Sequence, residues 1–414
     1  MAVYFNRSGG AYRISPSPNV AYTKIGYPIS SSYVSLDTAP DQYQVILDIY
    51  ESGSSDLIKR INSKPPSDMT YGFVVDPSKV FQGELDFDNN WKITGSVDPV
   101  NAVKTFELKA GEIYGTSPSS SLTIYPNQDT ETVTIFPGTI YPPDNLISTN
   151  QFWFNSSSIA GGTNILSNVP EAQYNPPFED LLYLGYNDYH TITILNADAA
   201  FNVRVFDVNN TVTYSAALSA SNFGTVGIGP QNLKDYGVSS SIVDNAARIT
   251  VTSLGSPNYS VFLPLYPDNP FVPCSDEYTR FAFINRYGFW DYYNVYNPVR
   301  TETTLDRELF NMTSLDTYQT YFGTRYQQAH PYNRQLHLSS RDVYSIDTDY
   351  ISKPLANWLE ELIESPSVFI QQGSEFIPIV ITDTSYTHNN DQSRNKLFKY
   401  TINWVTANPR RSRV

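Results

Sequence analysis

Hydrophobic residues recur at every second position in many short segments of the chain, which is the pattern of half-buried β-strands. In residues 43–50, Val45, Leu47 and Ile49 share one face. The same alternation predicts strands over 132–136, 191–195, 201–206, 248–252 and 259–263. Pro, Gly, Asn and Ser separate these segments at intervals of roughly 8–12 residues, which is typical of antiparallel sandwiches and barrels. We therefore expect a mainly β protein.

One segment has helical periodicity instead. Over 354–364 the apolar residues follow the i, i+3, i+4, i+7, i+8 spacing of an amphipathic helix. They are Leu355, Trp358, Leu359, Leu362 and Ile363. Pro354 suits the first helical position, and Pro366 prevents the helix from continuing. Alternating segments over 367–370, 376–381 and 396–405 predict strands of a sheet that this helix would cover.

The length of the chain predicts several domains, because 414 residues exceed what one hydrophobic core usually serves. Proline-rich segments at 137–155 and 265–273 mark two breaks. We expect two or three antiparallel β-sandwich domains in series, with the amphipathic helix packed on the sheet of the C-terminal domain. The predicted domains are 1–143, 144–272 and 273–414.

Composition excludes several classes of protein. A chain that is 40% hydrophobic and 14% aromatic is too rich in core-forming residues to be disordered throughout. No stretch approaches the ~18 apolar residues of a membrane helix, so we expect no membrane association. The first ten residues lack the apolar region of a signal peptide, so we expect no Sec-type export. The single cysteine, Cys274, cannot form an internal disulfide or a multi-cysteine zinc site.

The net charge of -14 is unevenly distributed. From Arg280 onward basic and acidic residues balance, so the whole acidic excess lies in residues 1–279. We expect that part to repel nucleic acid, because nucleic-acid binding requires clustered cations. The basic cluster is Arg410, Arg411 and Arg413. It is a solvated terminus, an arm that binds the acidic face of a neighbouring copy, or a DNA contact; self-assembly through this arm suits the charge distribution.

No catalytic motif is present in the sequence. It lacks a phosphate-binding loop, a dinucleotide glycine fingerprint, a nucleophile elbow and an HExxH pair, and its four histidines have no metal-ligand spacing. Two acidic sets, one of Glu84, Asp86 and Asp88 and the other of Asp347 and Asp349, have the period of a strand face. We interpret them as solvated faces, with calcium ligation or glycosidase chemistry as alternatives. We therefore expect no enzyme activity, cofactor or metal.

Aromatic residues concentrate in residues 289–296. On an alternating strand half of them face a core and the other half could lie in a subunit interface, where Tyr and Trp are favoured. The predicted interface residues here are Trp290, Tyr292, Tyr293 and Tyr296, joined by Tyr386 in the polar segment 383–391. The alternative is a stacking platform for a host surface glycan.

Several segments together resemble a family of tailed-bacteriophage virion structural proteins. They are 14–22, 43–50, 61–66, 72–76, 165–170, 181–184, Cys274 with 281–291, and 358–404. Gly288 would supply the positive φ of a hairpin turn in one of them. The family tends to have two glycines before its aromatic–Asp pair, and Tyr287 stands at the first of those positions here.

The resemblance implies a non-enzymatic virion component, made and assembled in the cytoplasm of the host bacterium. It would be present in multiple copies in the tail, baseplate or neck, in contact with itself and with other virion proteins. The alternatives are a capsid-decorating or vertex protein of the head, a receptor-binding carbohydrate module, and a glycosidase.

Overall fold

The chain forms two compact units, and each has its own core. Unit 1 consists of residues 1–269 with 283–292, and unit 2 consists of 270–282 with 293–414. In this computed structural model the described residues are 3–5, 12–15, 27–31, 44–63, 73–75, 77–88, 91–97, 101–115, 121, 123–137, 164–165, 184–195, 200–219, 223–253, 260–264, 278–286, 288–311, 319–320, 323–324, 333–348, 350–383 and 397–407.

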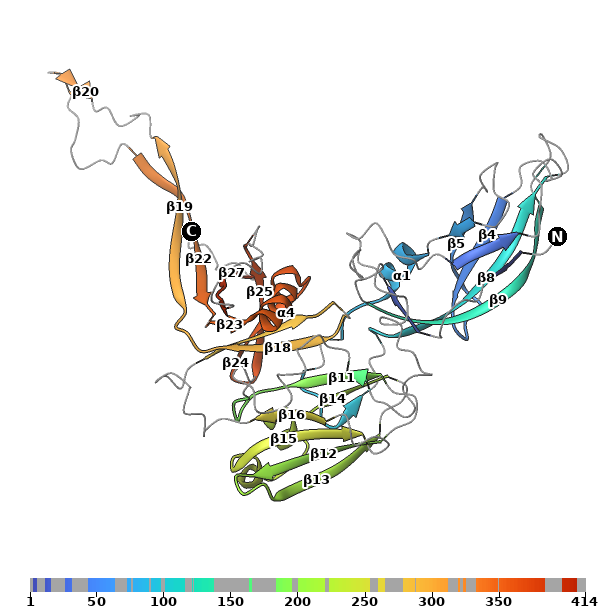
Figure 1. The fold of residues 1–414 in the computed structure, drawn as a ribbon. Helices are drawn as coiled ribbons and strands as arrows, with labels where there is room; N and C mark the ends of the chain where they lie inside the picture. The colour runs from blue at the N-terminus through green and yellow to red at the C-terminus, as the bar shows by residue number, and fades with distance from the viewer. Residues whose placement is uncertain are drawn as a thin grey trace. The chain divides into compact units, whose positions relative to one another are not determined.

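The expected mainly β fold class is confirmed (Figure 1). Most strand pairs are antiparallel, while β2 and β9 run parallel. None of the helices in the described part of the chain has the length and apolar character needed to cross a bilayer.

The N-terminal part of unit 1 contains a five-stranded sheet in the order β2-β9-β8-β4-β5. Its strands are β2 (Tyr12–Ser15), β4 (Gln44–Glu51), β5 (Leu57–Ser63), β8 (Lys104–Tyr114) and β9 (Thr123–Pro137). A three-stranded sheet in the order β1-β3-β6 comprises β1 (Val3–Phe5), β3 (Tyr27–Ser31) and β6 (Phe73–Val75). The helix α1 (Ser78–Glu84) places Phe81 against Phe106 of β8, with ring centroids 4.8 Å apart.

An ion pair between a buried aspartate and a partly exposed arginine joins β4 and β5 in this sheet. Asp48 is 1% exposed, and Arg60 lies directly opposite it. Arg60 donates hydrogen bonds of 2.5 and 2.7 Å to the two carboxylate oxygens. These hydrogen bonds and the negative charge of Asp48 raise the pKa of Arg60. The partner is required because a buried carboxylate is strongly unfavourable unless it is paired and hydrogen-bonded.

Two four-stranded sheets form the middle part of unit 1. One, in the order β10-β11-β14-β7, comprises β7 (Ser96–Val97), β10 (Asn164–Ile165), β11 (Thr191–Leu195) and β14 (Phe223–Gly227). The other, in the order β13-β12-β15-β16, comprises β12 (Ala200–Asp207), β13 (Val212–Ser219), β15 (Ala246–Ser253) and β16 (Ser260–Pro264). The short helices α2 (Pro230–Asp235) and α3 (Ser240–Val243) connect β14 to β15.

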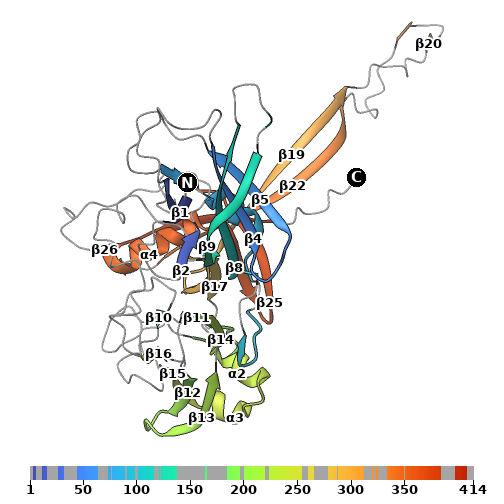
Figure 2. The same cartoon turned by 90° about the vertical axis from the view of Figure 1, so that its right-hand side faces the viewer.

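These two sheets lie as two layers in both views (Figure 1, Figure 2). In β12 the alternate residues Val203 and Val205 are buried, as the sequence pattern predicts. In β15 the burial does not alternate, because Thr250 is buried between Ile249 and Val251. The strand β7, from the predicted domain 1–143, pairs with β14 of the predicted domain 144–272. The structure therefore places both segments in one unit. The predicted boundary itself falls within 138–163, outside the described residues.

Unit 2 is built on a seven-stranded sheet in the order β18-β17-β24-β25-β27-β22-β19. Its strands are β17 (Thr279–Ile284), β18 (Trp290–Val295), β19 (Arg300–Asn311), β22 (Asn333–Asp347), β24 (Val368–Gln372), β25 (Glu375–Ile381) and β27 (Thr401–Thr406). The chain passes between the units within β17 and again within β18. Two small sheets pair β20 (Gln319–Thr320) with β21 (Gly323–Thr324) and β23 (Ile351–Ser352) with β26 (Leu397–Phe398).

The amphipathic helix of the sequence is α4 (Lys353–Glu364). Leu355, Trp358, Leu359 and Leu362 are each at most 3% exposed, which confirms the predicted apolar stripe. The strand predicted over 396–405 is instead two strands, β26 and β27, separated by Lys399 and Tyr400. The chain turns from one sheet to the other at that point.

The turn between β17 and β18 has the geometry expected for Gly288. Its φ is +85°, in the left-handed region that glycine favours. The amide of Gly288 donates to the carbonyl of Asn285 at 2.9 Å, and the amide of Asn285 donates to the carbonyl of Phe289 at 2.8 Å. A turn closed by a glycine with positive φ is a common short hairpin connection.

Candidate functional site

The predicted interface residues of the aromatic run lie mostly in the interior of the chain. Trp290, Tyr292 and Tyr293 are between 2% and 7% exposed, and Tyr296 is half-buried. The other predicted interface residues lie outside the described residues, and they are Tyr386, Arg410, Arg411 and Arg413. Their interface role stays a prediction.

Trp290 and Tyr292 contribute to the core of unit 1. Trp290 donates from Nε1 to the carbonyl of Asp88 at 2.7 Å and meets the Trp91 ring edge-on, with centroids 5.4 Å apart. The hydroxyl of Tyr292 lies 2.8 Å from Oγ1 of Thr191, and its ring lies 4.8 Å from that of His190. Both side chains satisfy their polar atoms within the chain. A sugar-stacking platform built on Trp290 would require it to be exposed, and it is not.

Tyr293 and Tyr296 belong to unit 2. The Tyr293 ring is T-shaped against Trp358 of α4, with centroids 5.9 Å apart. Tyr296 lies 5.5 Å from the ring of Tyr278. The sequence prediction assumed one buried and one open face, whereas every residue of β18 is buried. Contacts within the chain account for the burial of Trp290, Tyr292 and Tyr293, and their part in a subunit interface stays a prediction.

The exposed feature of unit 2 is a long two-stranded ribbon. The strands β19 and β22 pair from Arg300 opposite Ser345 to Asn311 opposite Asn333, whereas β22 pairs with β27 only from Tyr344 to Asp347. Within the described part of the chain, residues 302–311 and 333–343 therefore pair only with each other, and we call them the ribbon. The ribbon extends away from the other strands of unit 2 in both views (Figure 1, Figure 2). Residues 301–305 are all exposed.

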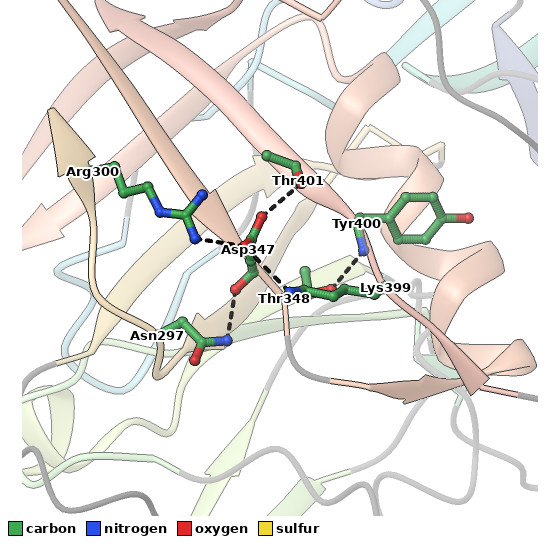
Figure 3. A network of polar contacts seen from close by, with 7 residues as sticks. All are labelled: Asn297, Arg300, Asp347, Thr348, Lys399, Tyr400 and Thr401. Carbon is green, nitrogen blue, oxygen red and sulfur yellow. Dashed lines mark hydrogen bonds and ion pairs between the residues drawn. The ribbon is translucent and has the colours of Figure 1, made fainter. Parts of the chain in front are cut away.

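Asp347 anchors the base of the ribbon (Figure 3). Its Oδ1 accepts a hydrogen bond of 2.6 Å from Oγ1 of Thr401, which lies directly opposite it on β27. Its Oδ2 lies 3.2 Å from Nη2 of Arg300 and 3.3 Å from Nζ of Lys399. Asn297 donates from Nδ2 to the main-chain oxygen of Asp347 at 2.8 Å. One acidic residue thus ties together β19, β22, β27 and the segments before β19 and β27.

The charge of Asp347 is stabilised by these contacts. The hydrogen bond from Thr401, then the hydrogen bond and charge of Lys399 and the charge of Arg300, together lower the pKa of Asp347 below its ordinary value of 3.8. Burial opposes this shift but is outweighed. At neutral pH the carboxylate is therefore ionised and holds both cations. The arrangement fixes strand positions, which is a positioning role rather than a chemical one.

The chain next to Asp347 is held by a second set of hydrogen bonds. Thr348 donates from its amide to the carbonyl of Tyr400 at 2.7 Å, and the amide of Tyr400 donates to Oγ1 of Thr348 at 2.8 Å. The hydroxyl of Tyr400 donates to Oε1 of Glu360 on α4 at 3.3 Å. Burial, and then the charge of Glu360 and this hydrogen bond, raise the pKa of Tyr400 to about 12. The ribbon base is thereby tied to α4.

The first acidic set, Glu84, Asp86 and Asp88, does not lie on one strand. Glu84 is the last residue of α1, and residues 85–88 follow the helix without strand pairing. The carboxylate of Asp88 accepts hydrogen bonds from Nδ2 of Asn101 at 2.8 Å and from the amide of Ala102 at 3.3 Å. The predicted period-2 face is therefore wrong for this set, because a short helix precedes it.

The second acidic set and the buried histidine were the other candidates for catalysis or metal binding, and the described ones make contacts within the fold. Asp347 is paired with cations rather than with a second acid, and Asp349 lies outside the described residues. His190 is 4% exposed and its amide donates to Oδ1 of Asn232 at 2.9 Å. Within the described ranges, no three His, Cys, Asp or Glu side chains are grouped so that they could hold a metal ion.

Sequence reasoning missed the residues around Asp347. Arg300, Lys399 and Thr401 are far from Asp347 in the sequence, and each taken alone is an unremarkable polar residue. No local pattern marked the two strands either, since the apolar residues of β19, Leu305, Leu309 and Phe310, do not alternate with polar ones. In the structure β19 and β22 are 12 and 15 residues long. Such strands exceed the usual length of about five or six residues.

Comparisons with known proteins do not assign the chain to a family. No protein-family model matches the sequence, and no curated protein matches it. Among solved structures, the chain is similar to native alpha-2-macroglobulin from Escherichia coli, in a crystal structure that spans domains NIE-MG1. The match has 9% sequence identity and a TM-score of 0.19, and it covers 64% of this chain and 96% of the other.

Proposed function

We propose that this chain is a non-enzymatic structural component of a tailed-phage virion, assembled in multiple copies in the tail, baseplate or neck. The observation that carries the proposal is the ribbon. A two-stranded hairpin is marginally stable by itself in water. A long ribbon that leaves its own sheet and exposes residues 301–305 is an arrangement suited to contact with a neighbouring subunit.

Two properties of the sequence support the same role. The acidic excess in residues 1–279 and the basic cluster at 410–413 give one chain complementary charges for contacts between copies. The segments that resemble phage virion proteins include 281–291, which contains the β17–β18 turn, and 358–404, which contains the second half of α4.

The base of the ribbon supports this role as well. An arm that makes contacts between subunits needs a fixed direction, because a mobile arm pays conformational entropy when it binds. Asp347, with Arg300, Lys399 and Thr401, holds the two strands of the arm against β27. The contacts of Asp347 would fix the direction of the ribbon whether the protein lies in the tail or in the head of the particle.

The test is the composition of purified particles. Mass spectrometry of gradient-purified phage should detect the chain as a virion protein, and gold-labelled antibody should place it at the tail, baseplate or neck. Label confined to the capsid would favour the capsid-decorating alternative. Absence of the chain from particles that contain the other structural proteins would overturn the proposal.

A variant without the ribbon connects the proposal to the structure. Thr303 and Asp342 lie opposite each other and their side chains share a hydrogen bond of 2.8 Å, so an Asn-Gly turn can close the hairpin between them in place of residues 304–341. We expect this variant to fold but to be excluded from particles. A matched control carries a short epitope tag between Asn209 and Asn210, in the β12–β13 turn, and should be incorporated normally.

A further inference from the structure

Among the described residues, no strand pairs with the outer edge of β19. The strand is the last in the order of its sheet, and its described pairing is with β22 on one side. Proteins usually protect such an edge with a short strand, charged side chains, a proline or a bulge. β19 has 12 residues with no Pro, and its bulge lies at Glu308 and Leu309. Residues 300–307 therefore form a regular edge. Its charged residues are of both signs, so they oppose pairing in some registers and favour it in others.

Symmetry limits how a second copy could use this edge. Two identical edges that pair antiparallel are related by a two-fold axis perpendicular to the sheet. Such an axis keeps each face of the sheet on the same side. Because side chains alternate between the faces, the axis must pass through a residue position, and each residue meets a residue of the same parity.

The charges on β19 select one position for the axis. With the axis at residue 303, Arg300 of each copy faces Asp306 of the other copy. Thr303 of one copy then faces Thr303 of the other. Glu302 then faces Thr304, and Thr301 faces Leu305. The strand forms two opposite-charge pairs and no like-charge pair over residues 300–306. Opposite charges directly across a pair of strands are stabilising, whereas like charges are destabilising.

An axis at 302, or at any position from 304 to 307, brings acids together. With the axis at 302, Glu302 of one copy would face Glu302 of the other. With the axis at 306, the two Asp306 residues would face each other in the same way. With the axis at 304, 305 or 307, two of the three acids Glu302, Asp306 and Glu308 would face each other. An axis at 301 would pair only three residues of the strand. Among the registers that pair more than three residues of the regular edge 300–307, the charge pattern is thus complementary to itself in one, which argues for a second copy of this chain as the occupant of the edge.

Arg300 can form an ion pair with Asp347 of its own chain and a second one with Asp306 of the other copy. Its side chain is 75% exposed, and Nη2 lies 3.2 Å from Oδ2 of Asp347 on the inner side of the strand. A guanidinium carries five N–H donors in a planar fork, so it can bind a second carboxylate while it keeps the first. The anchor at the base of the ribbon would thus hold an interface residue in position.

We propose that two copies of this chain pair antiparallel through the outer edges of β19, about a two-fold axis at Thr303, and so form one continuous sheet. This deepens the proposed function, on which it rests for its biological setting, by naming the contact between copies. The surface at the contact comprises residues 300–306.

Cysteine cross-linking tests the register. In a Cys274→Ser background, Thr303→Cys places two thiols opposite each other, where Cβ atoms are about 4.5–5.5 Å apart. A short bismaleimide should convert most of the purified chain into a covalent dimer. The matched control is Ser215→Cys, an exposed residue on β13, which is the outer strand of another sheet. It should give no dimer above the background of the cysteine-free chain.

Charge reversal tests the pairing in a second way. Asp306→Arg replaces two attractive pairs by two repulsive ones and should weaken dimerisation roughly tenfold or more in sedimentation equilibrium. Glu302→Arg makes the same change in net charge but faces Thr304, and should change dimerisation by less than about threefold. Unchanged thermal unfolding of each variant checks that the fold is retained.

The outcomes separate this inference from the proposed function. No Thr303 dimer, equal cross-linking through Ser215, or equal weakening by the two charge variants overturns the edge pairing. Particles that contain the chain but yield no Thr303 dimer overturn the pairing alone. That result would leave the edge to a strand of a different virion protein. A Thr303 dimer of the purified chain with no chain in particles overturns the proposed function alone.

Discussion

The hydroxyl of Tyr292 and Oγ1 of Thr191 lie 2.8 Å apart, so residues 101 positions apart in the sequence share a buried hydrogen bond. Thr191 is 2% exposed, and therefore cannot replace this partner with bulk water. The bond connects β18 to β11 within unit 1. It also gives Tyr292 a role inside the chain that its aromatic sequence context did not predict.

Tyr292→Phe should lower the free energy of unfolding by about 1 kcal/mol, because it leaves the Thr191 hydroxyl buried without its partner. Thr191→Val should cost a similar amount. The double variant should cost less than the sum of the two, because neither polar atom then remains unsatisfied. Urea unfolding of the four proteins measures this coupling, and strict additivity would contradict the assigned bond.

Local sequence patterns predicted much of the fold. The strand predicted over 191–195 coincides with β11, and the helix predicted over 354–364 differs from α4 by one residue. Both follow from a periodicity that short-range geometry imposes on neighbouring residues. The short helix α1 was missed, because its seven residues include Gly83 and are too few to establish a period.

The tertiary partners of the candidate residues could not be predicted in this way. Every residue of β18 is buried, so the strand has no open face from which alternation could distinguish core from interface. The Asp347 anchor joins Arg300, Lys399 and Thr401 from separate segments. Its assembly depends on which strands become neighbours in the sheet, and that order is not a local property of the chain.

Gly229 is required by close backbone contact. A Cβ at this position would lie 2.3 Å from the amide nitrogen of His190 and 2.6 Å from the carbonyl oxygen of Asp188. Neither atom belongs to a flexible side chain, so Gly229→Ala should lower the free energy of unfolding by about 2–3 kcal/mol. Gly83→Ala is the control, because nothing lies within 4 Å of its Cβ position and Gly83 is in α1.

The control should be neutral or should stabilise the chain by about 0.5–1 kcal/mol, because alanine is favoured over glycine within a helix. Thermal unfolding of the two alanine variants beside the parent chain decides the comparison. Similar melting temperatures for both variants would mean that the backbone at Gly229 moves easily.

Asp347 should make the ribbon base sensitive to acid. Its pKa is lower in the folded chain than its ordinary 3.8, so its contribution to stability is fully present above about pH 5. That contribution should be lost as the pH falls through 3.8 and then through the lower folded value. We expect Asp347→Asn to cost about 1 kcal/mol at pH 7, since both cations are partly exposed to solvent, and to cost nothing at the lowest pH.

Urea unfolding from pH 7 downward measures the difference between the parent chain and Asp347→Asn. Asp56→Asn, in an exposed turn between β4 and β5, serves as the control for removal of a carboxylate from the surface. A constant cost of Asp347→Asn across the whole pH range would show that the Arg300 and Lys399 contacts do not depend on the charge of the carboxylate.

Tyr400 should act at the alkaline end of the pH range. Its pKa is raised from 10.0 to about 12, chiefly by burial and then by Glu360. The neutral phenol is therefore favoured in the folded chain, so the stability that it contributes is present below pH 10 and is lost as the pH rises from 10 towards 12.

Tyr400→Phe cannot ionise and should escape this loss. At pH 7 it should cost only about 0.5 kcal/mol, for the lost hydrogen bond to Glu360. Stability curves of the two proteins should therefore converge or cross above pH 10, and the phenolate absorbance of the variant should lack one late-titrating tyrosine. Parallel curves up to pH 12 would contradict the assignment of the raised pKa to Tyr400.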